Sequence, residues 1–347
     1  MNFASDNAGP AHPAVLAALA AANEGHAPAY GADRWTLAAQ DRLREVFEAP
    51  EAAVHLVATG TAANALALAT LARPWQAVFC TEMAHIHEDE CNAPEAMTGG
   101  AKLVPIPAPE AKLAPDALRA AILKEETRGV HGPQRGPVSI TQATEKGTVY
   151  SAGEVAALGA VAREFGLGLH MDGARFANAL VSSNASPADL TWRAGVDALS
   201  FGGSKNGLMA VEAVILFDPA LSWEFELRRK RAAHLHSKHR FLAAQMMAYL
   251  EGDLWLDLAR RANRALARLV DGLRGAGAEI AWEPGANLVF ARLPRRRHKV
   301  LHEAGASYHL WDGPLEGDPE EPILARFVCD WSTSDTEVDR LVSLCGA

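Results

Sequence analysis

Short apolar runs alternate with helical patterns along the first two thirds of the chain. The runs are typical of strands and lie at Val54–Ala58, Ala77–Cys80, Leu103–Ile106, Val138–Thr141, Leu167–Asp172, Val196–Phe201 and Val211–Phe217. Helices are predicted between several of them, including Ala62–Leu71 and Gly153–Phe165. This alternation predicts an α/β fold with a mostly parallel, doubly wound central sheet that helices cover on both faces.

The pattern changes near Trp223. A long helical stretch is predicted from there to about Arg274, and two shorter strands follow it at Leu288–Ala291 and Ala325–Val328. We therefore expect a large domain over residues 1–245, which includes an N-terminal helical segment. A smaller α+β C-terminal domain is expected over residues 246–347, and the length of the chain allows both.

Composition disfavours several classes of partner. The formal net charge is -9, which argues against nucleic acid. No stretch is long and apolar enough to predict a membrane span, and the first residues lack the pattern of a signal peptide. The cysteines are scattered, form no CxxC pair and indicate free thiols in a reducing compartment. These features together predict a cytoplasmic protein.

Lys205 stands among very small residues after an apolar run, within Ser200-Phe201-Gly202-Gly203-Ser204-Lys205-Asn206-Gly207. Small flanks let a bulky planar group approach the backbone. Burial disfavours the ammonium form, so such an amine can become a nucleophile and form a Schiff base with an aldehyde cofactor. Taken alone, the pattern fits a solvated lysine in a strand-to-helix turn equally well.

Other polar residues follow predicted strands, where doubly wound sheets bind their ligands. Asp172 ends one strand and could pair with a protonated pyridine nitrogen, or with Arg175 in a structural ion pair. Gly60 and Thr61 lie between a strand and a helix, where backbone N–H groups bind phosphate. Helix capping explains the same threonine.

Histidines and one arginine complete the candidate set. His85 opens a segment dense in possible metal ligands, but HExxH is missing and no second cluster completes a set, so no metal is predicted. His85 could instead stack on a cofactor ring, and His131 is a second imidazole suited to proton transfer. Arg326 lies in an apolar strand and needs an anion, either a substrate carboxylate or a structural partner.

Together these positions describe one ligand, pyridoxal 5'-phosphate (PLP). The chain resembles the low-specificity L-threonine aldolases of the β-eliminating lyase group, within the fold type I (aspartate aminotransferase-like) PLP enzymes. The resemblance covers nearly the whole chain. The motifs that carry it are Ser5-Asp6-Asn7, Tyr30-Gly31-Ala32-Asp33, Gly60-Thr61-Ala62-Ala63-Asn64, His85, His131, His170-Met171-Asp172-Gly173-Ala174-Arg175, Ser204-Lys205-Asn206 and Arg326.

The resemblance implies which residues bind the cofactor. They are Gly60, Thr61, His85, Asp172, Arg175 and Lys205. Lys205 is implied to hold PLP covalently, and Asp172 is implied to keep the pyridine nitrogen protonated. Arg175 is implied to contact the ring hydroxyl.

It also implies a substrate site and an assembly. The substrate-binding residues are Ser5, Tyr30, His131, Arg175 and Arg326. Ser5 and Arg326 are expected to hold the substrate carboxylate, and His131 is expected beside the hydroxyl-bearing side chain. Tyr30 and basic residues of 230–240 are expected to complete a neighbouring subunit's site, within a homotetramer that shares its active sites.

The function implied is retro-aldol cleavage of L-threonine, L-allo-threonine and related β-hydroxy-α-amino acids to glycine and an aldehyde. The catalytic residues implied are Lys205, His85 and His131. Either histidine or an ordered water could take the β-hydroxyl proton. Two alternatives stay open: a PLP-dependent β-eliminating lyase acting on another amino acid, and a metal-dependent hydrolase.

Overall fold

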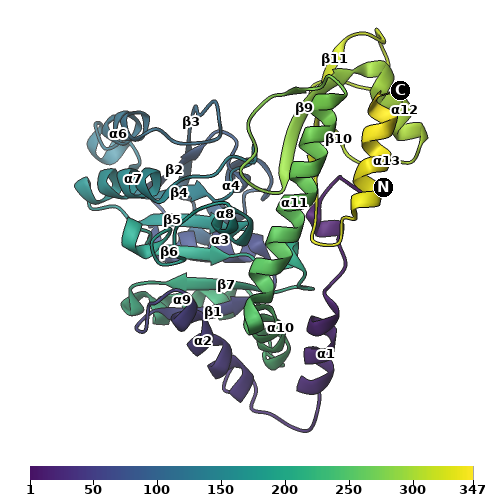
Figure 1. The fold of residues 1–347 in the computed structure, drawn as a ribbon. Coiled ribbons are helices and arrows are strands. Elements are labelled where there is room, and N and C mark those ends of the chain that lie inside the picture. The colour runs from purple at the N-terminus through teal and green to yellow at the C-terminus, as the bar shows by residue number, and fades with distance from the viewer. Residues whose placement is uncertain (347) are drawn as a thin grey trace.

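The computed structural model describes residues 1–346, and its centre is a seven-stranded sheet (Figure 1). The strand order is β1-β7-β6-β5-β4-β2-β3. Strand β7 pairs antiparallel with its two neighbours, and the other pairs are parallel. The strands are β1 (Ala53–Val57), β2 (Gln76–Thr81), β3 (Lys102–Ile106), β4 (Gln134–Thr141), β5 (Leu169–Gly173), β6 (Ala198–Phe201) and β7 (Glu212–Leu216). The predicted mostly parallel sheet is confirmed.

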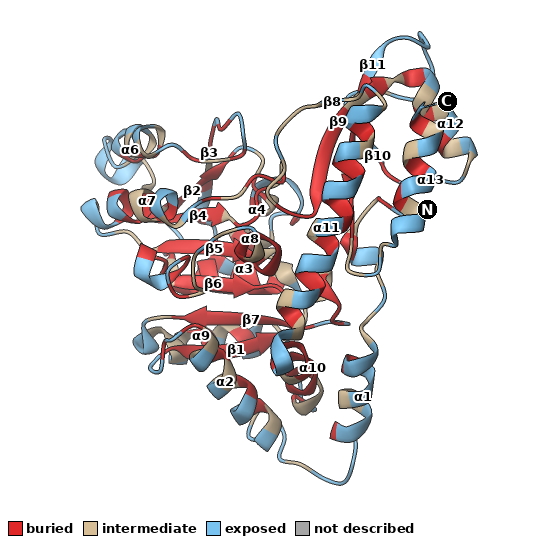
Figure 2. Cartoon of the chain, in the orientation of Figure 1, coloured by how far each residue is buried: buried red, intermediate tan, exposed pale blue. Residues whose placement is uncertain are grey.

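Helices cover both faces of this sheet because its strands are apolar on both sides. In β2, Ala77 and Phe79 pack into one core cluster while Val78 and Cys80 pack into another, as expected when successive side chains point to opposite faces. Figure 2 shows the sheet buried and the outer sides of the helices exposed. One face carries α3 (Gly60–Leu71), α4 (His85–Glu88), α5 (Ala93–Thr98) and α9 (Ser222–Arg231), and the other carries α2 (Arg34–Val46), α6 (Pro115–Lys124), α7 (Ala152–Glu164) and α10 (Arg240–Leu250).

Helix α3 shows how local sequence and packing fix one edge of the later site. Thr59 caps it, because the Thr59 hydroxyl accepts a hydrogen bond from the Ala62 amide at 3.2 Å. Alanine and leucine, which are strong helix formers, supply most of its residues. The helix is apolar around most of its surface and is accordingly buried from Ala62 to Thr70.

A four-stranded antiparallel sheet forms the C-terminal part, in the order β10-β11-β9-β8. The predicted strands Leu288–Ala291 and Ala325–Val328 lie within β9 (Leu288–Pro294) and β11 (Pro322–Val328), so the expected α+β character is present. The short outer strands and the helices were not predicted: β8 (Glu279–Ile280), β10 (His309–Leu310), α12 (Arg295–Glu303) and α13 (Asp335–Gly346).

Two segments connect the large and the small part, namely helix α11 (Leu254–Gly275) and the first residues of the chain. Helix α11 places Trp255 in the core of the large part and Leu269 in the core of the small part. Phe3 also packs in the small core, and Figure 1 shows both termini beside the smaller sheet. The first residues therefore pack with the C-terminal part, and a boundary between residues 245 and 246 stays a prediction.

The long helix expected from Trp223 to about Arg274 is wrong. The structure has three helices there, α9, α10 and α11. Ala233 follows α9 with a φ of 62°, and Gly252 lies between α10 and α11 with a φ of 57°. A left-handed residue cannot continue a right-handed helix, so the chain turns at both places.

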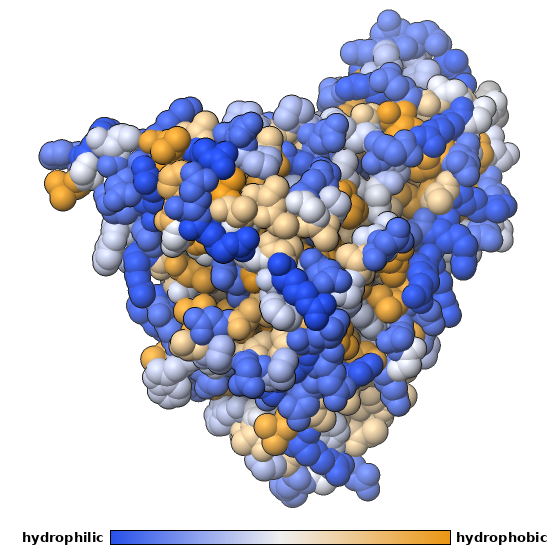
Figure 3. Space-filling view, turned by 60° about the vertical axis from the view of Figure 1, so that its left-hand side comes forward, coloured by the Kyte–Doolittle hydropathy of each residue, from blue (hydrophilic) through white to orange (hydrophobic). Residues whose placement is uncertain are grey.

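The surface is polar over most of the face shown in Figure 3, where hydrophobic side chains lie scattered among hydrophilic ones. Among residues 1–346, no helix has both the length and the apolar character needed to cross a bilayer.

Candidate active site

Most of the predicted site residues meet at one edge of the large sheet. Strands β2, β4, β5 and β6 are neighbours and run parallel, so their carboxyl ends lie side by side. A cavity of about 740 Å³ opens there. Its lining includes Ser5, Asn7, Glu82, Met83, His85, His87, Glu88, Asp89, Pro105, Glu145, Arg175, Lys205, Leu288, Trp311 and Arg326. The chain thus brings residues 5 to 326 together around Lys205.

Lys205 lies in a 3-10 turn (Ser204–Asn206) directly after β6. Its flanking glycines serve the packing of the protein itself, rather than leaving room for a cofactor as the sequence suggested. A Cβ on Gly202 would meet the Ala174 carbonyl, and one on Gly203 would lie 2.7 Å from the Val211 carbonyl oxygen. Burial, reinforced by the nearby Arg175 guanidinium, lowers the pKa of the Lys205 amine and favours its nucleophilic form.

Glu212 fixes the turn that carries this lysine. Its Oε2 accepts a hydrogen bond of 2.6 Å from the Gly203 amide, and its Oε1 accepts one of 3.4 Å from the Ser204 amide. The carboxyl is buried on β7, so the strand and the turn are held in one arrangement.

Asp172 is the buried carboxylate at the end of β5. Its Oδ1 accepts a hydrogen bond of 2.9 Å from the Ala174 amide, and its Oδ2 accepts one of 2.8 Å from the Asn64 amide nitrogen. Asn64 also donates to Glu90 at 2.9 Å. One side-chain amide therefore joins two buried carboxyl groups and holds helix α3 against β5.

His85 begins α4 and forms a pair with Glu90. Its Nδ1 lies 2.9 Å from the Glu90 Oε1. This hydrogen bond raises the pKa of His85 against the opposing effect of burial. Burial in turn raises the pKa of Glu90, although its bond to His85 works the other way. The contact with Glu90 engages Nδ1, and Nε2 has no hydrogen-bond partner among residues 1–346.

Arg175 is held by the Asp6 carboxylate, for which the sequence predicted no role. Its Nε and Nη2 donate to the two oxygens of Asp6 at 2.7 and 2.9 Å. Asn287 donates to Asp6 as well, at 3.0 Å. Burial alone would raise the pKa of Asp6, but the positive charges of Arg175 and Lys205 hold that pKa below its ordinary value.

Arg326 comes from the small sheet and reaches the same cavity. Its Nη2 donates to the Ala4 carbonyl at 3.2 Å, and its buried Nε has no partner among residues 1–346. The guanidinium lies 5.7 Å from the Trp311 ring. Burial and the charge of Arg175 lower the pKa of Arg326. Two partly buried cations therefore line the cavity, one of them with an unpaired N–H, and favour an anion there.

Gly60 and Thr61 form the first turn of α3, one turn before Asn64. The first N–H groups of a helix have no partner within it, and the helix dipole favours negative charge at this end. A Cβ placed on Gly60 would meet nothing within 4 Å. The backbone at this turn is therefore open to a phosphate group, as the sequence suggested.

Five predicted residues are not part of the cavity lining: Tyr30, Gly60, Thr61, His131 and Asp172. His131 ends a 3-10 turn (Gly129–His131) before the amino end of β4, whereas the cavity lies at the carboxyl end of that strand. The strand Gln134–Thr141 spans about 23 Å at 3.3 Å per residue, so His131 lies away from the cavity of its own chain, and its place beside the substrate stays a prediction. Tyr30 is 52% exposed, and the Lys230 ammonium lies 4.8 Å from its ring.

Glu145 lines the cavity and was not predicted at all. Its Oε1 accepts hydrogen bonds from the Thr141 hydroxyl at 2.7 Å and from the His85 amide at 3.0 Å. Nothing in its local sequence marks it, because it follows β4 in an ordinary loop. Asn64 and Glu90 were within reach of sequence reasoning, since both lie in segments already singled out.

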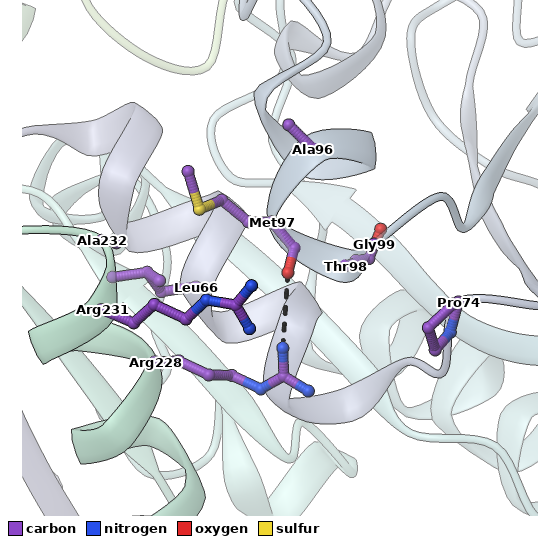
Figure 4. Close-up of a pocket in the computed structure, with 9 residues that line it drawn as sticks. All are labelled: Leu66, Pro74, Ala96, Met97, Thr98, Gly99, Arg228, Arg231 and Ala232. Atoms are coloured by element: carbon purple, nitrogen blue, oxygen red, sulfur yellow. Dashed lines mark hydrogen bonds between the residues drawn. The ribbon is translucent and has the colours of Figure 1, made fainter.

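A second cavity of about 400 Å³ lies between α3, α5 and α9, and Figure 4 shows its lining. Arg228 donates to the Met97 carbonyl there at 3.3 Å. This cavity shares no residue with the one around Lys205. Within residues 1–346, no three or more His, Cys, Asp or Glu side chains gather as metal ligands.

Comparison with known proteins agrees with this arrangement. Residues 2–294 match the model of the family described as beta-eliminating lyase. The chain belongs to the β-eliminating lyase family. The expected family, the fold class and the assignment as a lyase are confirmed.

Individual proteins and solved structures similar to this chain can also be compared with it. The chain is 43% identical to the low specificity L-threonine aldolase of Pseudomonas aeruginosa, over 99% of this chain and 95% of that protein. A solved structure of Leishmania major threonine aldolase has a TM-score of 0.92 at 29% identity, over 99% of this chain and 98% of that one. A structure of SPT with PLP has a TM-score of 0.72 at 16% identity, over 100% and 86%, and shares the fold.

The residues of this lyase fit PLP. Lys205 lines the cavity, Asp172 is a buried carboxylate whose charge acts on that amine, and Gly60 lies at the open N-terminus of α3. Each suits one part of the cofactor: the aldehyde, the ring nitrogen and the phosphate. The expected cofactor is therefore confirmed by the family and by the chemistry of the site.

Proposed function

We propose that this lyase cleaves L-threonine, L-allo-threonine and related β-hydroxy-α-amino acids to glycine and an aldehyde, with PLP bound at Lys205. The observation that carries the proposal is the convergence of Lys205, His85 and Arg326 in one cavity, with the charge of Asp172 acting on the Lys205 amine. The names of the relatives that share nearly its full length support it. When bound, PLP supplies an electron sink for a bond that breaks at Cα.

Residues near the N-terminus and near the C-terminus of the chain would together orient the substrate. Arg326 offers an unpaired Nε, and Ser5 lines the same cavity on the N-terminal segment. Together they would hold the carboxylate, leaving the Cα–Cβ bond as the one turned for cleavage. Asp6 keeps Arg175 beside the cofactor position, where its remaining N–H groups face the cavity.

Asp172 and His85 would flank the cofactor ring. Asp172 offers a buried negative charge to the ring nitrogen, and Asn64 and the Ala174 amide fix both of its oxygens. Glu90 fixes the orientation of the His85 imidazole through Nδ1. His131 lies outside the cavity of its own chain.

Tyr30 and the basic stretch 230–240 support a shared site. Tyr30 lies outside the cavity of its own chain and carries Lys230 against its ring. We expect this pair to face the cavity of a second subunit in a homotetramer, and analytical ultracentrifugation tests the assembly. A cytoplasmic location stays a prediction from composition.

Product analysis tests the proposed function. The protein is incubated with PLP and L-threonine, and we expect glycine and acetaldehyde in equal amounts. Ammonia and a keto acid would assign the chain to β-elimination instead. Activity that requires a metal and disappears with a chelator would support the hydrolase.

A further inference from the structure

Glu145 has one occupied oxygen and one free oxygen. Its Oε1 accepts the Thr141 hydroxyl and the His85 amide, at 2.7 and 3.0 Å. Its Oε2 is buried and has no hydrogen-bond partner among residues 1–346. A buried polar atom is rarely left unpaired, because the loss of its water costs about 1–3 kcal/mol. The free oxygen belongs to a side chain that lines the cavity of Lys205.

The surroundings of Glu145 raise the pKa of its carboxyl group, so that it can gain and lose a proton near neutral pH. Across residues 1–346, no lysine or arginine forms an ion pair with it. The titratable groups that face it are His85 on α4, Asp172 on β5, Cys80 on β2 and Tyr150. Burial, with a smaller effect of the Asp172 charge, raises its pKa to about 7 against the hydrogen bonds from Thr141 and His85.

We propose that Glu145 is a catalytic residue that takes the β-hydroxyl proton of the substrate on its free Oε2. This inference rests on the proposed aldol cleavage and names the base that the sequence left open. The hydrogen bonds to Oε1 fix the carboxyl beside the His85 amide, and Glu145 and Lys205 line the same cavity. The rival His131 lies at the far end of β4.

The step balances without a further reactant. The O–H bond breaks and its proton moves to the Glu145 Oε2, while the oxygen electrons form the C=O bond of the aldehyde. The Cα–Cβ bond breaks, and its electron pair stays with Cα. Cα then takes up one proton to give glycine, and Glu145 returns its proton to solvent, so no net proton is consumed.

The variant Glu145→Gln keeps the shape and the Oε1 acceptor but cannot take a proton. In the PLP-loaded enzyme, we expect kcat for L-threonine cleavage to fall by about 10²–10⁴-fold, the usual contribution of a general base. The visible absorption of bound PLP should persist. Exchange of the glycine α-proton in D2O, followed by NMR, should continue at the wild-type rate because glycine has no β-hydroxyl.

The pH profile gives an independent readout. A base must be ionised, so the wild-type kcat/KM should rise with pH through about 7, the pKa of Glu145. This limb should vanish in Glu145→Gln. In Thr141→Val the carboxylate loses a donor that stabilises its charged form, so the limb should move to higher pH. If Glu145→Gln fails to bind PLP, Thr141→Val tests the proposal alone: a limb at higher pH supports Glu145 as the base, and an unmoved limb contradicts it.

Glu110→Gln is the matched control, because it removes an exposed carboxylate from a neighbouring loop outside the cavity. Its cleavage rate and pH profile should equal those of the wild type. An unchanged cleavage rate in Glu145→Gln, or equal losses in cleavage and glycine exchange, would overturn the assignment of Glu145. A wild-type enzyme that makes no glycine from threonine would count against the proposed function instead.

Discussion

Three buried carboxyl groups of the site differ in what surrounds each one. Asp172 has a donor on both oxygens, Glu90 has two donors on Oε1, and Glu145 has its donors on Oε1 alone. Hydrogen bonds to the charged form favour ionisation, whereas burial opposes it. The same functional group is therefore set for different tasks by its neighbours.

The pair of His85 and Glu90 leads to a prediction about a single proton. In Glu90→Gln the imidazole keeps a neutral neighbour but loses the carboxylate that raises its pKa. We expect His85 to lose its proton at a lower pH than in the wild type. Histidine NMR titration measures this directly.

Glu88→Gln is the control for that titration, since Glu88 contacts His87 at 2.8 Å rather than His85. The His85 titration should be unchanged in this variant. Equal titration curves for wild type and Glu90→Gln would show that the hydrogen bond does not control the proton of His85.

The sequence predicted the chemistry of the site residues better than it predicted the contacts between them. Lys205, Asp172, His85 and Arg326 stood out because each is polar beside an apolar run. Glu145, which accepts the His85 amide, could not be read from the sequence because this contact joins two separate segments.

At the scale of elements, the site lies at the ends of strands, and the sequence predicted where those strands end. Strands and short turns were predictable because apolar runs stop where polar residues begin, as at Asp172. The helix predicted from Trp223 to about Arg274 failed for the opposite reason. Its three segments all favour helix, and they are separated by turns that contain the left-handed residues Ala233, Gly252 and Asp253.

Asp6 shows how one ion pair holds several elements together. It lies in the 3-10 turn Asp6–Ala8, Arg175 directly precedes α8 (Phe176–Val181), and Asn287 precedes β9. Asp6→Asn would leave the partly buried guanidinium without its carboxylate. We expect the free energy of unfolding to fall by about 3 kcal/mol, measured by urea denaturation.

Asp116→Asn is a suitable comparison, because Asp116 pairs with Arg119 at 3.2 Å with its side chain 100% exposed. An exposed pair contributes about 0–1 kcal/mol. Similar losses in the two variants would mean that burial does not strengthen the link between Asp6 and Arg175.

At the scale of the whole molecule, the site forms where the two parts of the chain meet. Arg326, Leu288 and Trp311 come from the small part, whereas Lys205 and His85 come from the large one. The sequence indicated both parts and most of the chemistry. It could not show that Phe3 packs in the small core or that His131 lies at the other end of β4, because both depend on how distant elements pack.

The central claim is that Lys205 binds the cofactor, and the visible absorption spectrum tests it most directly. Wild-type protein and Lys205→Ala are each loaded with PLP, dialysed and measured before and after addition of L-threonine, and glycine is assayed. We predict that the wild type keeps a visible band that changes with threonine while glycine accumulates, and that Lys205→Ala loses this band. A band of equal strength in dialysed Lys205→Ala would contradict the account.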